Sequence, residues 1–188
     1  MPQLLTTPTP TPLPSMPDDA LNARIVAVVH DLLRLEPGPL AALRRTSPGA
    51  GCAAFWRIYH RAGLAESPRP ASADWEHALH ALALLIPTGR DEAKPSPHDA
   101  RTALGRALFA AGVSHERLAR LLATPFAARR EALARATRRL AREQLPFDLR
   151  HLARLMLRDN QGDLRLLASA YYGAEAAAEH SEKDKTDA

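Results

Sequence analysis

Four arginines, Arg135, Arg138, Arg139 and Arg142, follow one another at intervals of three, one and three residues. On a helix this spacing places them in one stripe about 10 Å long. Guanidinium groups this close together repel one another unless an anion lies alongside, and their planar forks fit phosphate oxygens in two-point contacts. The stripe therefore predicts a surface that binds a nucleic-acid backbone. A basic face that is merely solvated is the alternative.

The helix that carries this stripe needs an apolar side that packs against a core. Residues 125–145 are predicted to form one helix, which Pro146 ends. Apolar residues fall on a different side from the arginines, so we expect the stripe to point away from the core. Replacing its four arginines with alanine should then leave the fold intact. The apolar residues are Phe126, Leu133, Ala136 and Leu140.

The preceding residues, 101–124, predict two shorter helices joined by a turn. Gly112 lies where a left-handed residue ends the first helix, and Ser114 lies where an N-cap begins the second. The apolar faces of the two helices leave a basic exterior. The arginines on that exterior are Arg101, Arg106, Arg117 and Arg120.

A second basic pair, Arg44 and Arg45, ends a short predicted helix near residues 39–46. Cations at the negative end of a helix dipole can also serve as a cap, so that role stays open for this pair. The candidate nucleic-acid-binding residues are Arg44, Arg45, Arg101, Arg106, Arg135, Arg138, Arg139 and Arg142.

Charge is unevenly distributed along the chain. Residues 1–100 carry 9 basic and 10 acidic side chains, a net of −1, whereas residues 101–173 carry 14 and 6, a net of +8. The last fifteen residues carry 2 and 5, a net of −3. A basic surface bounded by a neutral half and an acidic end indicates a polyanionic partner.

The fold class predicted from periodicity is all-α, a single compact domain of about eight or nine helices with disordered ends. Alanine, leucine and arginine favour helices, and no alternation of period two is present. The expected boundaries are a disordered Pro-rich arm at 1–17, a helical domain at 18–173 and an acidic disordered tail at 174–188. Residues 74–87 predict a helix that is apolar nearly all round and buried centrally. The aromatic residues Phe55, Trp56 and Tyr59 are expected in the core, and stacking on nucleic-acid bases is the less favoured alternative.

Several function classes find no support in the sequence. The histidines are scattered, the single Cys52 has no evident base, and no Gly-rich phosphate loop exists, so we expect no catalytic residues and no cofactor. His77 and His80 lack the further ligands of a metal site, so no metal is expected. The N-terminus lacks a basic signal region and no apolar run approaches about 18 residues, which favours a cytoplasmic protein without membrane contact.

Four segments resemble the CasB family, the small subunit of type I-E CRISPR Cascade complexes. The most specific is ALGRALFAAGVSHERLARLL at 103–122, which is similar to that family's LGRAL block with its following Gly and Glu-Arg. AALRR at 41–45, AAFWRIYH at 53–60 and LAREQLPFDLRHLARLML at 140–157 resemble further segments in the right order. The Pro-rich arm, the acidic end and Phe-Asp-Leu at 147–149 depart from the family pattern.

The resemblance implies a non-catalytic subunit of a crRNA-guided antiviral complex. Its implied partners are the crRNA and the target DNA with its displaced strand, the Cascade backbone and large subunits, and a second copy of itself. Its basic surfaces would stabilise the R-loop through phosphates, without reading sequence. A helix-turn-helix regulator is the alternative, with residues 113–136 as the motif. A helical adaptor that binds no nucleic acid is a third possibility.

Overall fold

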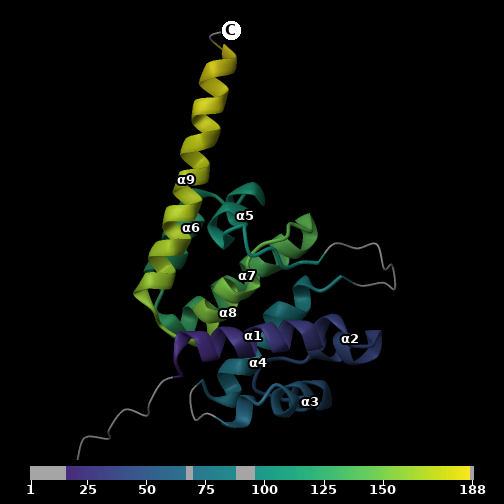
Figure 1. Ribbon diagram of the computed structural model, residues 1–188. Coiled ribbons are helices and arrows are strands. Elements are labelled where there is room, and N and C mark those ends of the chain that lie inside the picture. Colours follow the sequence, from purple (N-terminus) through teal and green to yellow (C-terminus); the bar gives the residue numbers. More distant parts are fainter. Residues whose placement is uncertain (1–15, 67–69, 88–95, 187–188) are drawn as a thin grey trace, which may run out of the picture.

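The computed structural model describes residues 16–66, 70–87 and 96–186, and in these ranges the chain is helical without a strand (Figure 1). One isolated bridge joins His98 to Phe147. The all-α prediction is therefore confirmed. In chain order the helices are α1 (Asp18–Leu33), α2 (Pro37–Arg45), α3 (Ala53–Arg61), the 3₁₀ helix η1 (Leu64–Glu66), α4 (Ser72–Leu85), α5 (Leu104–Ala110), α6 (His115–Ala123), α7 (Phe126–Glu143), α8 (Leu149–Leu157) and α9 (Gln161–Thr186).

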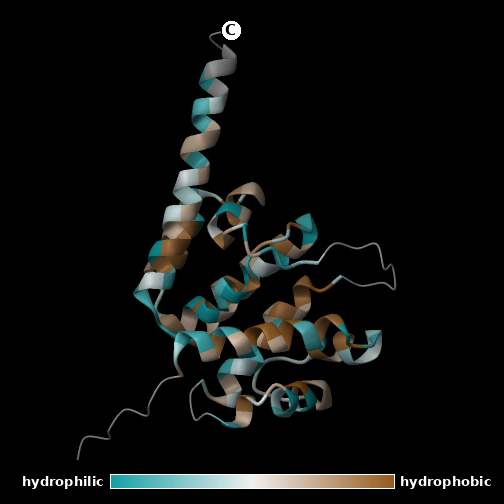
Figure 2. Cartoon of the chain, in the orientation of Figure 1, coloured by the Kyte–Doolittle hydropathy of each residue, from teal (hydrophilic) through white to brown (hydrophobic). Residues whose placement is uncertain are grey.

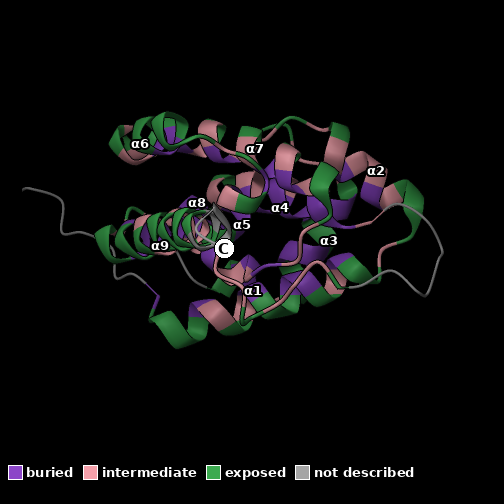
Figure 3. Ribbon diagram, turned by 90° about the horizontal axis from the view of Figure 1, so that it is seen from above, coloured by how far each residue is buried: buried purple, intermediate pink, exposed green. Residues whose placement is uncertain are grey.

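Helix α4 is central, as its nearly continuous apolar sequence predicted. Trp75, Leu79 and Leu82 are fully buried. Alanines between them, such as Ala78, let neighbouring helices approach closely, and α4 packs against α1, α2, α3, α7 and α8. Seen from above, it lies between α7 and α3 (Figure 3). These neighbours cover most of the helix, and its remaining side, with Glu76, His77 and His80, is only partly exposed, which agrees with its nearly continuous apolar sequence.

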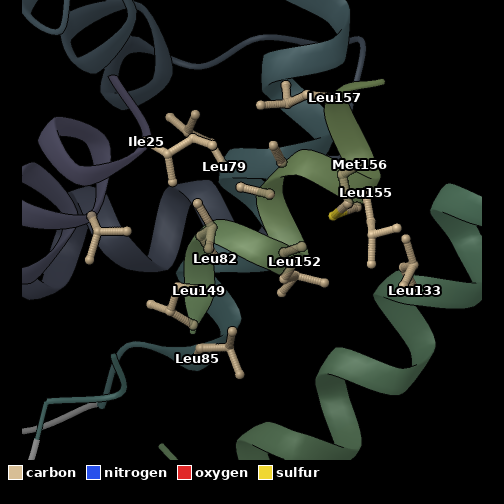
Figure 4. Close-up of a cluster of buried hydrophobic side chains, with 14 of the residues drawn as sticks. Ile25, Leu79, Leu82, Leu85, Leu133, Leu149, Leu152, Leu155, Met156 and Leu157 are labelled. Carbon is tan, nitrogen blue, oxygen red and sulfur yellow. The ribbon is translucent and has the colours of Figure 1, made fainter. Parts of the chain in front are cut away.

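Helix α8 forms the second half of the core. Seven of its nine residues are buried. Leu152 and Met156 lie among residues from α1, α4 and α7, including Ile25, Leu82 and Leu133 (Figure 4). Core packing of this kind fixes α7 from one side and leaves its other side free.

The turn after α5 has the form that Gly112 predicted. Gly112 has a φ of 68°, and its N–H donates to Phe109 while the N–H of Val113 donates to Leu108, at 2.8 and 3.0 Å. These two bonds form a Schellman cap, in which the left-handed position suits glycine. The turn directs the chain into α6, and Ser114 occupies the N-cap position as predicted.

Helix α9 corrects the predicted C-terminal boundary. We expected it to end at Gly173, but it continues to Thr186 and stands out from the body (Figure 1). Gly173 costs a helix only about 1 kcal/mol relative to alanine, and four alanines at 174 and 176–178 favour continuation. The strongly hydrophobic residues of α9 lie in the half next to the body (Figure 2). The acidic residues from 174 onward are thus helical as far as the described chain reaches.

The structure also differs from the predictions at the N-terminal arm and at one aromatic residue of α3. Residues 1–15 of the predicted Pro-rich arm lie outside the described residues, whereas Met16 is buried against the core. In α3, Phe55 and Tyr59 are buried as expected, but Trp56 is 44% exposed. Successive residues of a helix point 100° apart, so a helix at the edge of the body cannot bury adjacent positions equally.

Within the described ranges, no helix combines the length and the apolar character that crossing a membrane would need.

Candidate nucleic-acid interface

Helices α6 and α7 form a hairpin joined only by Thr124 and Pro125. Its inner face is apolar, because Leu118 in α6 and Leu133 and Leu140 in α7 are each 1% exposed. This shared face fixes the rotation of both helices about their axes. The arginines at the other positions consequently point outward or toward the space between the two helices.

A groove of about 390 Å³ lies between α6 and α7. Its lining includes small and apolar side chains from both helices and from the turn before α6, such as Leu121, Ala132, Ala136 and Val113. A second hollow of about 480 Å³ is lined by residues that extend to Arg142 and Glu143 near the end of α7. We call the two together the α6–α7 groove. The arginines that line it are Arg117 and Arg120 from α6 and Arg135, Arg138, Arg139 and Arg142 from α7.

The groove has a strong positive charge. Its lining holds these six arginines and two acids, Glu131 and Glu143, which leaves a net of +4. Only Arg135 forms an ion pair with either acid among the described residues, at 3.5 Å from Glu131, and both side chains are more than 60% exposed. Such an exposed pair is worth at most about 1 kcal/mol, so an arriving phosphate can displace it. The groove is therefore suited to a polyanion.

Arg139 differs from the rest of the predicted stripe. Its Nε donates a hydrogen bond to the carbonyl of Ala111, and its guanidinium lies against Gly112. It thus satisfies a carbonyl at the C-terminal end of α5 while bordering the groove. Our expectation that all four stripe arginines face away from the fold is wrong for this residue. Replacing it would disturb the α5 cap as well as the groove.

Arg44 also has a structural role. Its guanidinium donates to the carbonyl of Ala83, at 2.8 Å, and to that of Ile86, and both carbonyls belong to the C-terminal end of α4. Burial of this side chain lowers the pKa of Arg44 below its usual value. The capping alternative for the Arg44–Arg45 pair therefore applies to Arg44, but on α4 rather than on its own helix. Arg45 is exposed at the end of α2.

We expect Arg44→Ala to destabilise the protein without changing its affinity for nucleic acid. The substitution leaves two carbonyls at the end of α4 without a donor, which should cost about 1–3 kcal/mol. Thermal unfolding would report this loss, and fluorescence anisotropy with labelled DNA would report affinity. Arg45→Ala is the matched control and should not lower the melting temperature. A stable Arg44→Ala variant with weakened DNA binding would contradict this assignment.

The remaining predicted residues do not line the α6–α7 groove. Arg101 is almost fully exposed, and its Nε lies 3.9 Å from a carboxylate oxygen of Asp99. Arg106 is exposed on α5. Both are free to meet solvent or a partner, but they stand apart from the residues that border the groove. The structure thus unites the four stripe arginines and leaves the other four candidates outside.

Two arginines near the start of α7 form contacts within the fold. Arg129 is 4% exposed and its Nη1 lies 2.8 Å from a carboxylate oxygen of Asp159. Arg130 pairs with Asp74 at 2.5 Å and covers the ring of Phe126 at 4.4 Å. Residues that a DNA-reading helix would use at its N-terminal end are therefore unavailable.

Comparison with known proteins identifies the family. A family model for CRISPR-associated protein Cse2 matches residues 39–172. The chain belongs to the Cse2 family. Family membership confirms the resemblance seen in the sequence and supports a role as a Cascade subunit.

A crystal structure of CasB from Thermobifida fusca is similar to this Cse2-family chain in fold. The TM-score is 0.54 at 22% sequence identity, and the similarity covers 84% of this chain and 96% of that chain. Among the curated proteins no sequence matches. The all-helical architecture is thus one that a solved CasB structure shares.

Sequence reasoning placed Arg117 and Arg120 on the basic exterior but did not make them candidate contacts. They border the groove opposite the α7 stripe. One available signal was their spacing of three residues on a helix whose apolar face is Leu118 and Leu121. A two-residue connection to the next helix forces the helices to be neighbours, so these arginines must lie near the stripe.

Proposed function

We propose that this Cse2-family chain is a non-catalytic small subunit that holds a nucleic-acid backbone in the α6–α7 groove. The observation that carries the proposal is the convergence of six arginines from two helices on one groove with a net charge of +4. Guanidinium groups on both sides of a strand can contact successive phosphates in two-point geometry. Binding of this kind depends on charge and does not read bases.

The family and the groove together support the partners that we propose. In a crRNA-guided complex, base pairing reads the target sequence, and a subunit that grips phosphates can stabilise the opened DNA. We therefore propose that the groove binds the R-loop, including the displaced strand. The crRNA, the Cascade backbone and large subunits, and a second copy of the chain are the other proposed partners.

The helix-turn-helix alternative is not favoured. Its reading helix would be α7, yet Arg129 and Arg130 at the start of α7 are engaged with Asp159 and Asp74. The exposed arginines of this helix that line the groove, Arg135, Arg138 and Arg142, occupy its C-terminal half. A recognition helix instead contacts bases mainly from its N-terminal residues.

The proposal predicts sequence-independent, salt-sensitive binding by the isolated full-length chain. If the five groove arginines other than Arg139 each contact one phosphate, log Kd should change with log salt by about 4 to 5 on duplex DNA and about 3 to 4 on single strands. Anisotropy titrations with several unrelated sequences over a salt series would measure these slopes. Affinity that does not respond to salt would favour the adaptor, and a strong preference for one duplex sequence would favour the regulator.

A further inference from the structure

Trp56 is the feature that neither the core nor the groove explains. Its side chain is 44% exposed, whereas the other tryptophan, Trp75, is fully buried. Leaving part of an indole in water forgoes some of the roughly 25 cal/mol per Å² that burial would yield. Only five large hydrophobic side chains are exposed to this degree in the described ranges, and Trp56 is the largest of them.

The indole is held in a fixed position. Its plane lies at 72° to the ring of Phe55 and at 84° to that of Tyr59, with centroids 4.9 and 5.7 Å away. Both of those rings are buried. Beside it, the indole Nε1 lies 3.0 Å from the place that a Cβ on Gly51 would take. Trp56 is therefore supported by the core from beneath while part of it faces solvent.

Apart from the small Ala53, the other exposed side chains of α3 are arginines and a histidine. Arg57 and His60 are exposed on the same helix, and the His60 ring lies 6.3 Å from the indole at an angle of only 30°. No ion pair engages Arg57 among the described residues. Two acids contact this region: Glu76 already accepts the backbone N–H groups of Gly49 and Gly51, and Asp31 pairs with Arg61 at the end of α3. Helix α3 itself contains no acid.

We propose that Trp56, flanked by Arg57 and His60, stacks on an unpaired base of a single-stranded nucleic acid. An aromatic face with an adjacent cation, here Arg57, is the arrangement that binds single strands without regard to sequence, because every base has a π-face and is joined to a phosphate. Tryptophan beside arginine also occurs at protein interfaces, so association with other Cascade subunits is measured as a separate outcome below. The site is separate from the α6–α7 groove, since α4 lies between α3 and α7 (Figure 3).

Tryptophan fluorescence of the full-length chain tests this site directly, because the sequence has two tryptophans and only Trp56 is accessible. Single-stranded oligothymidine should quench the emission as it binds, since stacking brings a base against the indole. Heparin has the charges without the bases, so it should compete for the groove but leave the emission unchanged. Trp56→Phe, which retains Trp75, should abolish the response.

Affinity gives a second readout. Trp56→Ala should weaken binding of oligothymidine by about 5- to 150-fold, the range for losing one stacked base. Tyr172→Ala is the matched control, because Tyr172 is also an exposed aromatic, at 40%, but lies on α9, and its removal should leave affinity unchanged. Melting temperatures would verify that both variants fold.

Three outcomes would overturn the site. Oligothymidine binding without quenching, wild-type affinity in Trp56→Ala, or equal quenching by fully paired duplex would each exclude base stacking. None of these would affect the groove, which fails instead if heparin and DNA both show no salt-dependent binding. If Trp56→Ala loses association with other Cascade subunits while DNA affinity is unchanged, Trp56 is a protein contact and the stacking proposal is wrong.

Discussion

Alanine at Arg117, Arg135, Arg138 and Arg142 should reduce affinity for DNA at least about 100-fold at low salt, with the fold retained. The four side chains border the α6–α7 groove and are exposed, and among the described residues none of them bonds to a carbonyl at a helix end. Each lost phosphate contact should lower the salt slope on duplex DNA by about one. Alanine is the best helix former, and fewer like charges repel, so the melting temperature should hold or rise slightly.

The control for this prediction removes the same charge elsewhere. Arg34 and Arg165 are exposed on the surface and do not line the groove. The double variant Arg34→Ala/Arg165→Ala should therefore lose much less affinity than Arg135→Ala/Arg138→Ala. Equal losses would mean that net charge alone attracts DNA. If the quadruple variant no longer assembles with other Cascade subunits, the groove pairs with acidic residues of a neighbouring subunit instead.

The stripe on α7 could be predicted because helical periodicity is a local property. Spacing of three and four residues places Arg135, Arg138 and Arg142 on one side whatever the rest of the chain does. The contacts that each arginine makes could not be predicted in the same way. Arg139 and Arg44 reach carbonyls at the ends of α5 and α4, and such contacts exist only once distant helices are packed together.

The groove, too, exists only once helices are packed together, so the sequence alone could not predict it. Its α6 side was visible in the sequence only as two arginines on an amphipathic helix, and only the packing of α6 on α7 turns them toward the stripe. For Trp56, the prediction from the sequence was wrong. Neighbouring aromatic residues indicated a core cluster, but α3 is covered on one face only, so the cluster divides between core and surface.

The C-terminal boundary was misjudged from composition. Loss of leucine and gain of charge after Ala174 indicated disorder, because such a segment cannot bury a core. Helices do not need a core along their whole length, however. The first half of α9 is anchored by Leu164, Leu167 and Tyr171, and a helix that is already nucleated extends at little cost through alanine and glutamate.

Gly105 should be the glycine at which a methyl group does most harm. It lies in the LGRAL segment of α5, where α5 crosses α9 with backbone against backbone. A Cβ there would stand 2.2 Å from the carbonyl oxygen of Leu167 and 2.6 Å from the nitrogen of Tyr171. Backbone atoms cannot rotate away as a side chain can, so the two helices must separate.

We expect Gly105→Ala to lower the free energy of unfolding by about 3 kcal/mol or more, the upper range for overpacking. That loss corresponds to a fall in melting temperature of roughly 10 °C for a chain of this size. Gly173→Ala is the matched control in α9, because a Cβ at Gly173 meets nothing within 4 Å. It should raise stability by about 0.5–1 kcal/mol through helix propensity alone. Urea unfolding of both variants measures the two changes. If Gly105→Ala is as stable as wild type, α5 and α9 do not cross this closely, and the role assigned to this glycine is wrong.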